Sequence, residues 1–138
     1  MTEDKYKNLS LLILNTNILY KRALSSLLKP YKLSILKVEA LRLLNGTDSI
    51  VSLEFVKENL TRSGVDASRM INELKKNGLV TRTRSSRDRR GIHIKITAAG
   101  KTILNEVEKQ SFENKLLNHL EENEMEQLKC ILKKIVKK

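Results

Sequence analysis

The sequence has 138 residues, and its 40% hydrophobic and 31% charged fractions are those of an ordinary folded domain, which excludes a disordered chain. The formal net charge is +11, and the excess is concentrated in residues 61–101, which hold eleven Lys and Arg and three acidic residues, whereas residues 102–138 hold seven of each. A localised basic excess favours a polyanionic partner, with nucleic acid ahead of an anionic membrane. A basic surface tuned only for solubility is the alternative.

Two features bear on the compartment. The single cysteine, Cys130, excludes an internal disulfide and fits a reducing environment. The apolar run at residues 11–14 is too short for a signal peptide, and no stretch approaches the length that spans a bilayer. We therefore expect a cytoplasmic protein with no membrane partner.

The N-terminal third predicts a long amphipathic helix. Apolar residues recur at helical spacing from Leu9 onward. Because the residue before a proline disfavours the helical conformation, Pro30 should end this helix near Leu28 or Lys29.

Two shorter helices should follow. Ser34 is suited to cap a second helix, which Gly46 would stop. After a very short extended segment at residues 50–51, Ser52 is suited to cap a third helix that reaches Leu60. The positions expected to be buried are Val38, Leu41 and Leu44 in the second helix and Leu53, Val56 and Leu60 in the third.

A fourth helix and two strands are predicted next. Ser63 and Asp66 have the spacing of a capping box, which would open a helix that stops at Gly78. Its buried positions would be Ala67, Met70 or Ile71, and Leu74. The sequence then alternates over residues 79–84 and 92–97, which predicts two strands, and residues 85–91 form a polar connection of hairpin length.

The C-terminal region predicts two more helices. Thr97 is suited to cap a long fifth helix that would run through Leu120, and Asn123 and Glu126 have the spacing of a second capping box at the start of the last helix. The expected fold is mainly α with a small β-hairpin.

Two short helices joined by a tight turn and followed at once by a hairpin are the element order of a winged helix-turn-helix, whose second helix enters the major groove of DNA. Arg69 suits guanine and Asn72 suits adenine by bidentate hydrogen bonding, and Gly64 allows close backbone approach. Lys75 and Lys76 are placed for contacts with the DNA backbone. The full outward set is Gly64, Val65, Asp66, Ser68, Arg69, Asn72, Lys75 and Lys76. An ordinary solvated helix face is the alternative.

The predicted hairpin is unusually rich in arginine. Five guanidinium groups within nine residues cost electrostatic free energy unless a polyanion neutralises them, and a hairpin tip is slim enough to enter a minor groove. We expect the one acid, Asp88, to hold a neighbouring arginine through paired hydrogen bonds. The candidate residues are Arg82, Arg84, Ser86, Arg87, Asp88, Arg89 and Arg90. A solvated basic turn is the alternative.

Three stretches carry a resemblance to a known family: residues 33–44, residues 59–80, and above all Asp88-Arg89-Arg90 followed by Ile96-Thr97-Ala98-Ala99-Gly100. With them the chain resembles the MarR family of bacterial regulators, in which a D-x-R wing motif precedes a strand that ends in L-T-x-x-G. Ile96 stands here where Leu is usual, and Thr61-Arg62 replaces the usual Gly and apolar residue in the turn between the helices.

The resemblance implies a homodimer whose two winged helix-turn-helix domains grip a pseudo-palindromic operator. The DNA-binding domain would comprise residues 33–97, and N- and C-terminal dimerisation helices would comprise residues 1–32 and 98–138. It also implies that Asp88 orients Arg90 into the minor groove, and that the residues around Asp66, Ser68 and Arg69 read the major groove.

Other ligands find little support in the sequence. Many MarR-family members bind small effectors, but no residue here identifies one, so a small-molecule effector stays a possible partner of unknown chemistry. Cys130 does not match the N-terminal cysteine by which some members sense oxidants, and we expect it to be inert packing inside the last helix. His93 and His119 lack the spaced partners of a metal site, so no metal and no cofactor are expected.

The sequence thus predicts a sequence-specific transcription regulator, a repressor by family resemblance, and not an enzyme. Two alternatives stay open. One is a winged-helix module for protein assembly whose basic surface meets an acidic protein, and the other is a non-specific architectural DNA binder.

Overall fold

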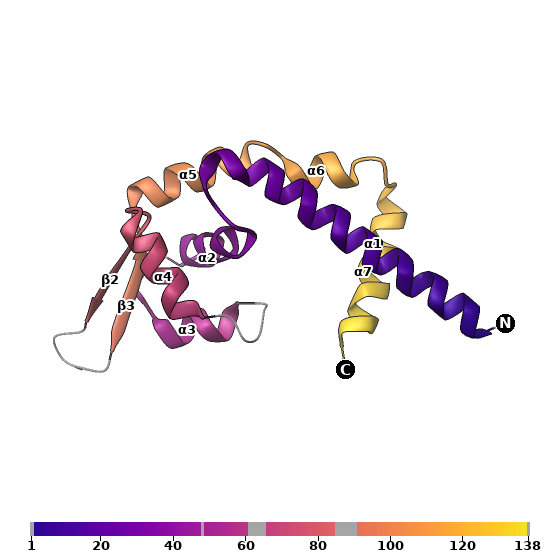
Figure 1. Ribbon diagram of the computed structural model, residues 1–138, viewed down its shortest axis with the longest axis horizontal. Coiled ribbons are helices and arrows are strands. Elements are labelled where there is room, and N and C mark those ends of the chain that lie inside the picture. Colours follow the sequence, from indigo (N-terminus) through magenta and orange to yellow (C-terminus); the bar gives the residue numbers. More distant parts are fainter. Residues whose placement is uncertain (1, 48, 61–65, 85–90, 138) are drawn as a thin grey trace. The chain divides into compact units, whose positions relative to one another are not determined.

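The computed structural model describes residues 2–47, 49–60, 66–84 and 91–137, and the chain divides into two compact units, Met1–Val107 and Glu108–Lys138. The first contains α1 (Thr2–Leu28), the 3-10 turn η1 (Lys29–Tyr31), α2 (Ile35–Asn45), β1 (Val51–Ser52), α3 (Leu53–Asn59), α4 (Ala67–Lys76), β2 (Val80–Arg84), β3 (Ile92–Ile96) and α5 (Ala98–Glu108) (Figure 1). The second contains α6 (Phe112–Leu117) and α7 (Glu122–Val136). The mainly helical fold with a small sheet confirms the predicted fold class.

Helix α1 ends where Pro30 predicts, at Leu28, but it begins at Thr2, seven residues before the first residue of the predicted apolar pattern. Only its C-terminal part is packed: Leu24 and Leu28 are buried, whereas Leu12 is 62% exposed. Local helical propensity therefore extends α1 well beyond the segment that the core holds in place.

The predicted caps of α2 and α3 are confirmed. The Ser34 hydroxyl accepts a hydrogen bond from the Lys37 N–H at 3.2 Å, and the Ser52 hydroxyl accepts one from the Phe55 N–H at 3.1 Å. Helix α2 ends at Asn45 as expected, although Gly46 has a φ of −76° and does not use the left-handed conformation of a typical glycine stop.

Helix α4 begins later than predicted. Its N-cap is Asp66, whose carboxylate accepts a hydrogen bond from the Arg69 N–H at 3.0 Å, so Asp66 is not the fourth residue of a capping box that starts at Ser63. Asp is as good an N-cap as Ser, so Asp66 can satisfy the free N–H groups of a first turn that starts at Ala67. The helix ends in a Schellman motif, with Gly78 at a φ of +77° and the Leu79 N–H donating to the Leu74 carbonyl at 2.9 Å.

The sheet has three antiparallel strands in the order β1–β3–β2, and its central register pairs Arg82 with Ile94. Helix α2 packs on β3, α3 packs on β1 and α4, and α4 packs on β2. The largest fully buried side chains are Leu28, Leu41, Leu44, Val56, Ile71, Leu74 and Ile94. The core therefore lies between the three helices and the inner face of the sheet.

The T-x-x-G motif forms the corner between the sheet and α5. The Thr97 hydroxyl donates to the Gly78 carbonyl at 2.7 Å and accepts from the Gly100 N–H at 3.0 Å, which confirms Thr97 as the cap of α5. A Cβ at position 100 would lie 2.2 Å from the Leu79 carbonyl oxygen, so only glycine allows α5 to approach the start of β2 this closely.

Two predictions for the C-terminal region are wrong. The long fifth helix stops at Glu108, because Ser111 adopts a left-handed conformation with a φ of +50°, and α6 follows as a separate helix. The last helix starts from Glu121, not Asn123: the Glu121 N–H donates to the Glu124 carboxylate at 2.9 Å, the reciprocal bond of a capping box two residues earlier than expected.

Helix α7 has no buried residue within its own unit, and Cys130 is exposed rather than packed as predicted. Among the described helices, none combines the length and the apolar character that a membrane crossing needs.

Candidate nucleic-acid interface

Helix α4 has a buried face and a polar face. Ala67, Met70, Ile71 and Leu74 are all buried, as the helical spacing predicts. Arg69 and Asn72 are exposed on the other side, together with Asp66, Lys75 and Lys76, while Ser68 is half-buried. The predicted orientation of the helix is confirmed. The other two members of the set, Gly64 and Val65, lie outside the described residues, as do Ser63 and Thr61-Arg62 of the preceding turn.

An ion-pair network links α4 to α2. The Glu73 carboxylate lies 3.2 Å from the Lys37 ammonium of α2 and 3.6 Å from the Arg69 Nε one turn earlier on α4. The Arg69 side chain is 79% exposed, so this contact restrains its direction and contributes only a few tenths of a kcal/mol. Sequence reasoning missed Glu73, although its i, i+4 spacing from Arg69 was visible.

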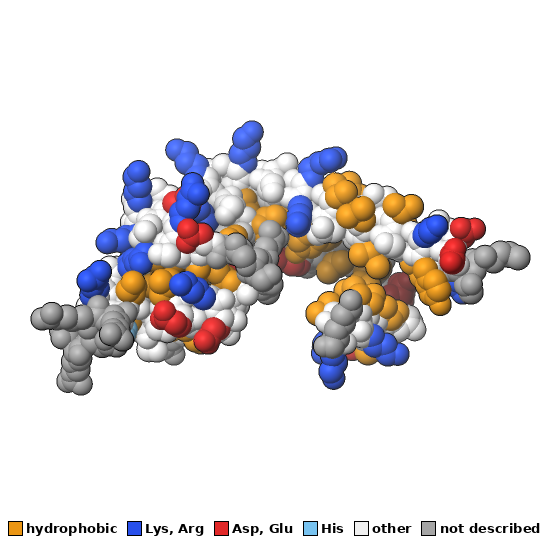
Figure 2. All heavy atoms as spheres, turned by 60° about the horizontal axis from the view of Figure 1, so that its bottom comes forward, with side chains coloured by type: hydrophobic (Ala, Val, Ile, Leu, Met, Phe, Trp, Pro, Cys, Tyr) orange, Lys and Arg blue, Asp and Glu red, His pale blue; other side chains and the backbone are white. Residues whose placement is uncertain are grey.

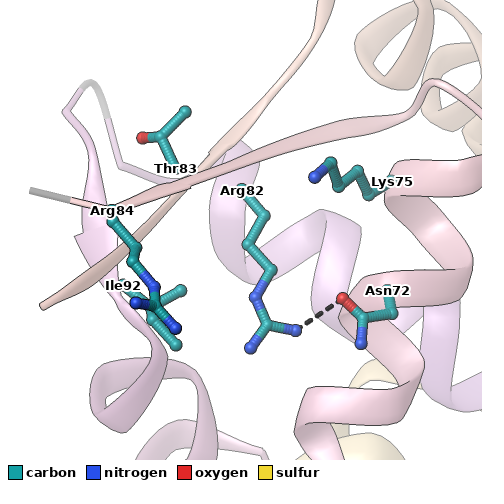
Figure 3. A pocket seen from close by; sticks show the side chains of 6 residues that line it. All are labelled: Asn72, Lys75, Arg82, Thr83, Arg84 and Ile92. Carbon is teal, nitrogen blue, oxygen red and sulfur yellow. Dashed lines mark hydrogen bonds between the residues drawn. The ribbon is translucent and has the colours of Figure 1, made fainter. Parts of the chain in front are cut away.

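Strand β2 turns one of the predicted hairpin arginines back toward α4. The strand alternates, so that Val80, Arg82 and Arg84 share one side and Thr83 takes the other (Figure 3). The Arg82 Nη1 donates a hydrogen bond to the Asn72 Oδ1 at 2.6 Å and another to the Ser68 carbonyl at 3.3 Å. Arg82 therefore joins β2 to α4.

A pocket of about 270 Å³ lies in the angle between α4 and the β2–β3 ribbon, by which we mean strands Val80–Arg84 and Ile92–Ile96 (Figure 3). Of its described lining side chains, three are cationic and none is acidic, which suits a polyanion. The lining residues are Asn72, Lys75, Arg82, Thr83, Arg84 and Ile92. The structure thus brings part of the α4 set and part of the hairpin set to one surface.

The rest of the predicted hairpin set lies outside the described residues. This applies to Ser86, Arg87, Asp88, Arg89 and Arg90, and with them to the predicted pairing of Asp88 with a neighbouring arginine.

A second pocket, of about 150 Å³, lies between α1 and α2 and was not indicated by any sequence motif. It combines aliphatic side chains from both helices with polar and charged ones. Its lining residues are Asn17, Tyr20, Lys21, Leu24, Ile35, Val38, Glu39 and Arg42. Within the described ranges, no group of three or more His, Cys, Asp or Glu is placed to hold a metal ion.

Comparison with known families matches residues 22–107 to the family of the transcriptional regulator SarA/Rot. This match runs from the C-terminal part of α1 through α5 and includes every described residue of the α4–β2 surface. The chain belongs to the SarA/Rot family of transcriptional regulators. No curated protein matches this SarA/Rot-family chain.

Solved structures show the same fold. A variant of MarR from E. coli, complexed with operator DNA, is 24% identical with a TM-score of 0.80, and the match covers 94% of each chain. MepR from S. aureus, in a complex with DNA, is 22% identical with a TM-score of 0.81 over 92% of this chain and 95% of that one. CouR from Rhodococcus jostii, bound to p-coumaroyl-CoA, is 21% identical with a TM-score of 0.74 over 92% and 90%. The predicted MarR-like winged helix-turn-helix fold is confirmed.

Proposed function

We propose that this SarA/Rot-family regulator binds duplex DNA in a sequence-specific manner, as a homodimer on a pseudo-palindromic operator, and that it acts as a repressor. One observation carries the proposal: Arg82 joins β2 to α4, so that the exposed Arg69, Lys75 and Arg84 belong to one connected basic surface. A helix and a ribbon fixed in this way suit adjacent grooves of one duplex.

Each part of this surface has a proposed role. The N-terminal half of α4 reads the major groove, with Arg69 directed at guanine, while Gly64, Val65, Asp66 and Ser68 approach the DNA at the helix start. Lys75 and Lys76 contact phosphates. On the ribbon side, Arg84 and Ser86, Arg87, Arg89 and Arg90 approach the adjacent minor groove, where Asp88 orients Arg90.

The homodimer is supported by two apolar surfaces, one on each compact unit. On α1 the exposed hydrophobic side chains include Leu9, Leu12 and Ile13, and Figure 2 shows hydrophobic side chains exposed along the N-terminal part of this helix. On α7 they include Ile131 and Ile135. Exposed apolar surface of this extent marks an interaction surface, and a second copy of the chain is the partner that closed symmetry favours. We therefore keep residues 1–32 and 98–138 as the proposed dimerisation segments.

The remaining elements of the proposal follow from DNA binding. A DNA-bound repressor works in the cytoplasm and has no catalytic step. A small-molecule effector stays a prediction, and CouR with its bound p-coumaroyl-CoA is a structural relative that takes a small ligand.

Selection of bound duplexes from a random pool tests sequence specificity directly. We expect enrichment of a palindrome whose half-sites lie about one helical turn apart, and sedimentation of a dimer at micromolar concentration. Binding without an enriched sequence would favour the architectural alternative. Binding that does not weaken steeply with salt would favour the protein-assembly alternative.

A further inference from the structure

Arg82 differs from Arg84, the other hairpin arginine within the described residues, because its guanidinium group is turned toward α4. We propose that Arg82 is a positioning residue, which locks the β2–β3 ribbon to α4 and presents Asn72 to DNA as a hydrogen-bond donor. The inference rests on the proposed function, since it assigns roles within the same DNA-binding surface.

The geometry of Arg82 is suited to holding β2 against α4. Its strand position is held by pairing with Ile94, a fully buried residue at the centre of the sheet, so the root of the side chain is fixed. Its Nη1 then reaches two acceptors on α4, the Asn72 Oδ1 at 2.6 Å and the Ser68 carbonyl at 3.3 Å. Because guanidinium is always charged, both are charge-assisted bonds, which are stronger than bonds between neutral groups.

Arg84, two residues along the same side of β2, provides the contrast. It is exposed at the end of the strand, whereas Arg82 is half-buried. Figure 3 shows the Arg82 guanidinium directed at Asn72 on α4, while Arg84 lies farther along the strand. Two arginines of one strand therefore have different roles: Arg82 sets the angle between ribbon and helix, and Arg84 is available to contact DNA directly.

The same bond defines what Asn72 offers to DNA. Arginine has only donors, so the atom of Asn72 that faces it must be the amide oxygen. The amide nitrogen then points away from Arg82 (Figure 3). A bidentate pair with adenine needs the amide oxygen to accept from the base, and here Arg82 already takes one of the two lone pairs of that oxygen. The free amide N–H of Asn72 therefore favours acceptors on the base edges, such as the guanine N7 and O6 or the thymine O4, over the bidentate pair with adenine predicted from sequence.

The test uses charge-conserving variants of the full chain and the duplex that the wild type selects from a random pool. Arg82→Lys keeps the charge but loses the planar fork, so we expect about tenfold weaker binding with an unchanged salt dependence. The matched control, Arg42→Lys on the exposed face of α2, lies outside the α4–β2 surface and should stay within about twofold of the wild type. Arg82→Lys binding that is as tight as that of Arg42→Lys would overturn the positioning role.

A double-mutant cycle with Asn72→Ala separates a lock from two independent DNA contacts. We expect the double variant to bind about as tightly as the weaker single variant, whereas multiplying losses would overturn the coupling. In the DNA-free protein, NMR should show separate guanidinium N–H signals for Arg82, because its hydrogen bonds restrict rotation of the group. In Asn72→Ala these signals should merge or broaden beyond detection. Their persistence would also contradict the lock.

A third arm reads base preference. Duplexes selected by the wild type and by Asn72→Ala should differ at a guanine or thymine. A difference at adenine that depends on its N6 amino group, which only an acceptor can contact, would overturn the donor assignment. If the wild type selects no duplex at all, the proposed function fails. If it selects one and Arg82→Lys behaves like Arg42→Lys, the inference alone fails.

Discussion

The surface around α4 and β2 and the surfaces of α1 and α7 use their side chains in opposite ways. Helix α4 buries every apolar position of its inner face and exposes a polar face, so it is complete within one chain. The N-terminal part of α1 and all of α7 leave large apolar side chains in solvent, such as Leu12 at 62% and Ile131 at 54% exposure. The α4–β2 surface is therefore suited to a polar, charged partner, whereas the exposed surfaces of α1 and α7 are suited to contact with another protein surface.

The largest expected effect concerns the corner that holds the winged part together. Gly100→Ala would place a Cβ 2.2 Å from the Leu79 carbonyl oxygen and 2.7 Å from the Ile96 side chain, so α5 or β2 must shift. We expect the free energy of unfolding to fall by about 3–5 kcal/mol in urea titrations. Gly46→Ala is the matched control: its Cβ would meet ordinary contacts at 3.5 Å, and its stability should change by less than about 1 kcal/mol. Equal losses would contradict the close approach.

The second effect tests the other side of the comparison. Ile131→Asp places a charge on the exposed apolar face of α7, where it should weaken dimerisation by at least about 2 kcal/mol while the chain stays folded. Sedimentation equilibrium measures the shift toward monomer, and circular dichroism checks the fold. Glu58→Lys, a charge change on the exposed face of α3, should leave the dimer intact. A dimer unaffected by Ile131→Asp would remove α7 from the interface.

The third effect is confined to DNA. Arg69→Ala should cost about 1–3 kcal/mol of binding to the selected duplex and much less on a scrambled duplex, because a base contact is lost rather than a general attraction. Fluorescence anisotropy at fixed salt provides both affinities. Glu73→Gln is the companion variant: it removes the carboxylate that restrains Arg69 and competes with DNA for it, so a modest gain in affinity is expected. Equal losses on both duplexes would reassign Arg69 to the DNA backbone.

The smallest effect concerns the start of α4. Asp66→Ala removes the acceptor of the Arg69 N–H and should cost about 1 kcal/mol of stability. Asp66→Asn keeps an acceptor of similar capping strength, so thermal unfolding should place it close to the wild type. If both variants lose the same amount, the charge of Asp66 matters rather than the cap.

Local signals predicted most of the first unit. The positions of α2–α4, β2 and β3 follow from patterns that each involve only a few neighbouring residues. These patterns are the serine caps, the helical spacing of apolar residues and the alternation along the strands. The failures have physical causes. Asp66 and Ser63 are both good caps, and only the competition between them in the folded chain chooses Asp66. The break at Ser111 uses a left-handed conformation that carries no glycine or proline signal.

The candidate surface was predicted in part. The outward residues of α4 follow from spacing, and strand alternation places Arg82 and Arg84 on one side. The inward turn of Arg82 depends on the distance between β2 and α4, which no sequence pattern contains. The sequence alone therefore predicts Arg82 to face outward with the other hairpin arginines, and it indicates no partner for the amide oxygen of Asn72.

The most direct test of the central claim, that α4 and the β2–β3 ribbon form one DNA-facing surface, is residue-resolved NMR of the full chain with and without the selected duplex. We expect the largest amide shifts together in residues 66–76 and 80–96, while the amides of α7 stay nearly unchanged. Shifts confined to α7 or to the N-terminal part of α1, or changes in α4 without changes in β2, would contradict the account.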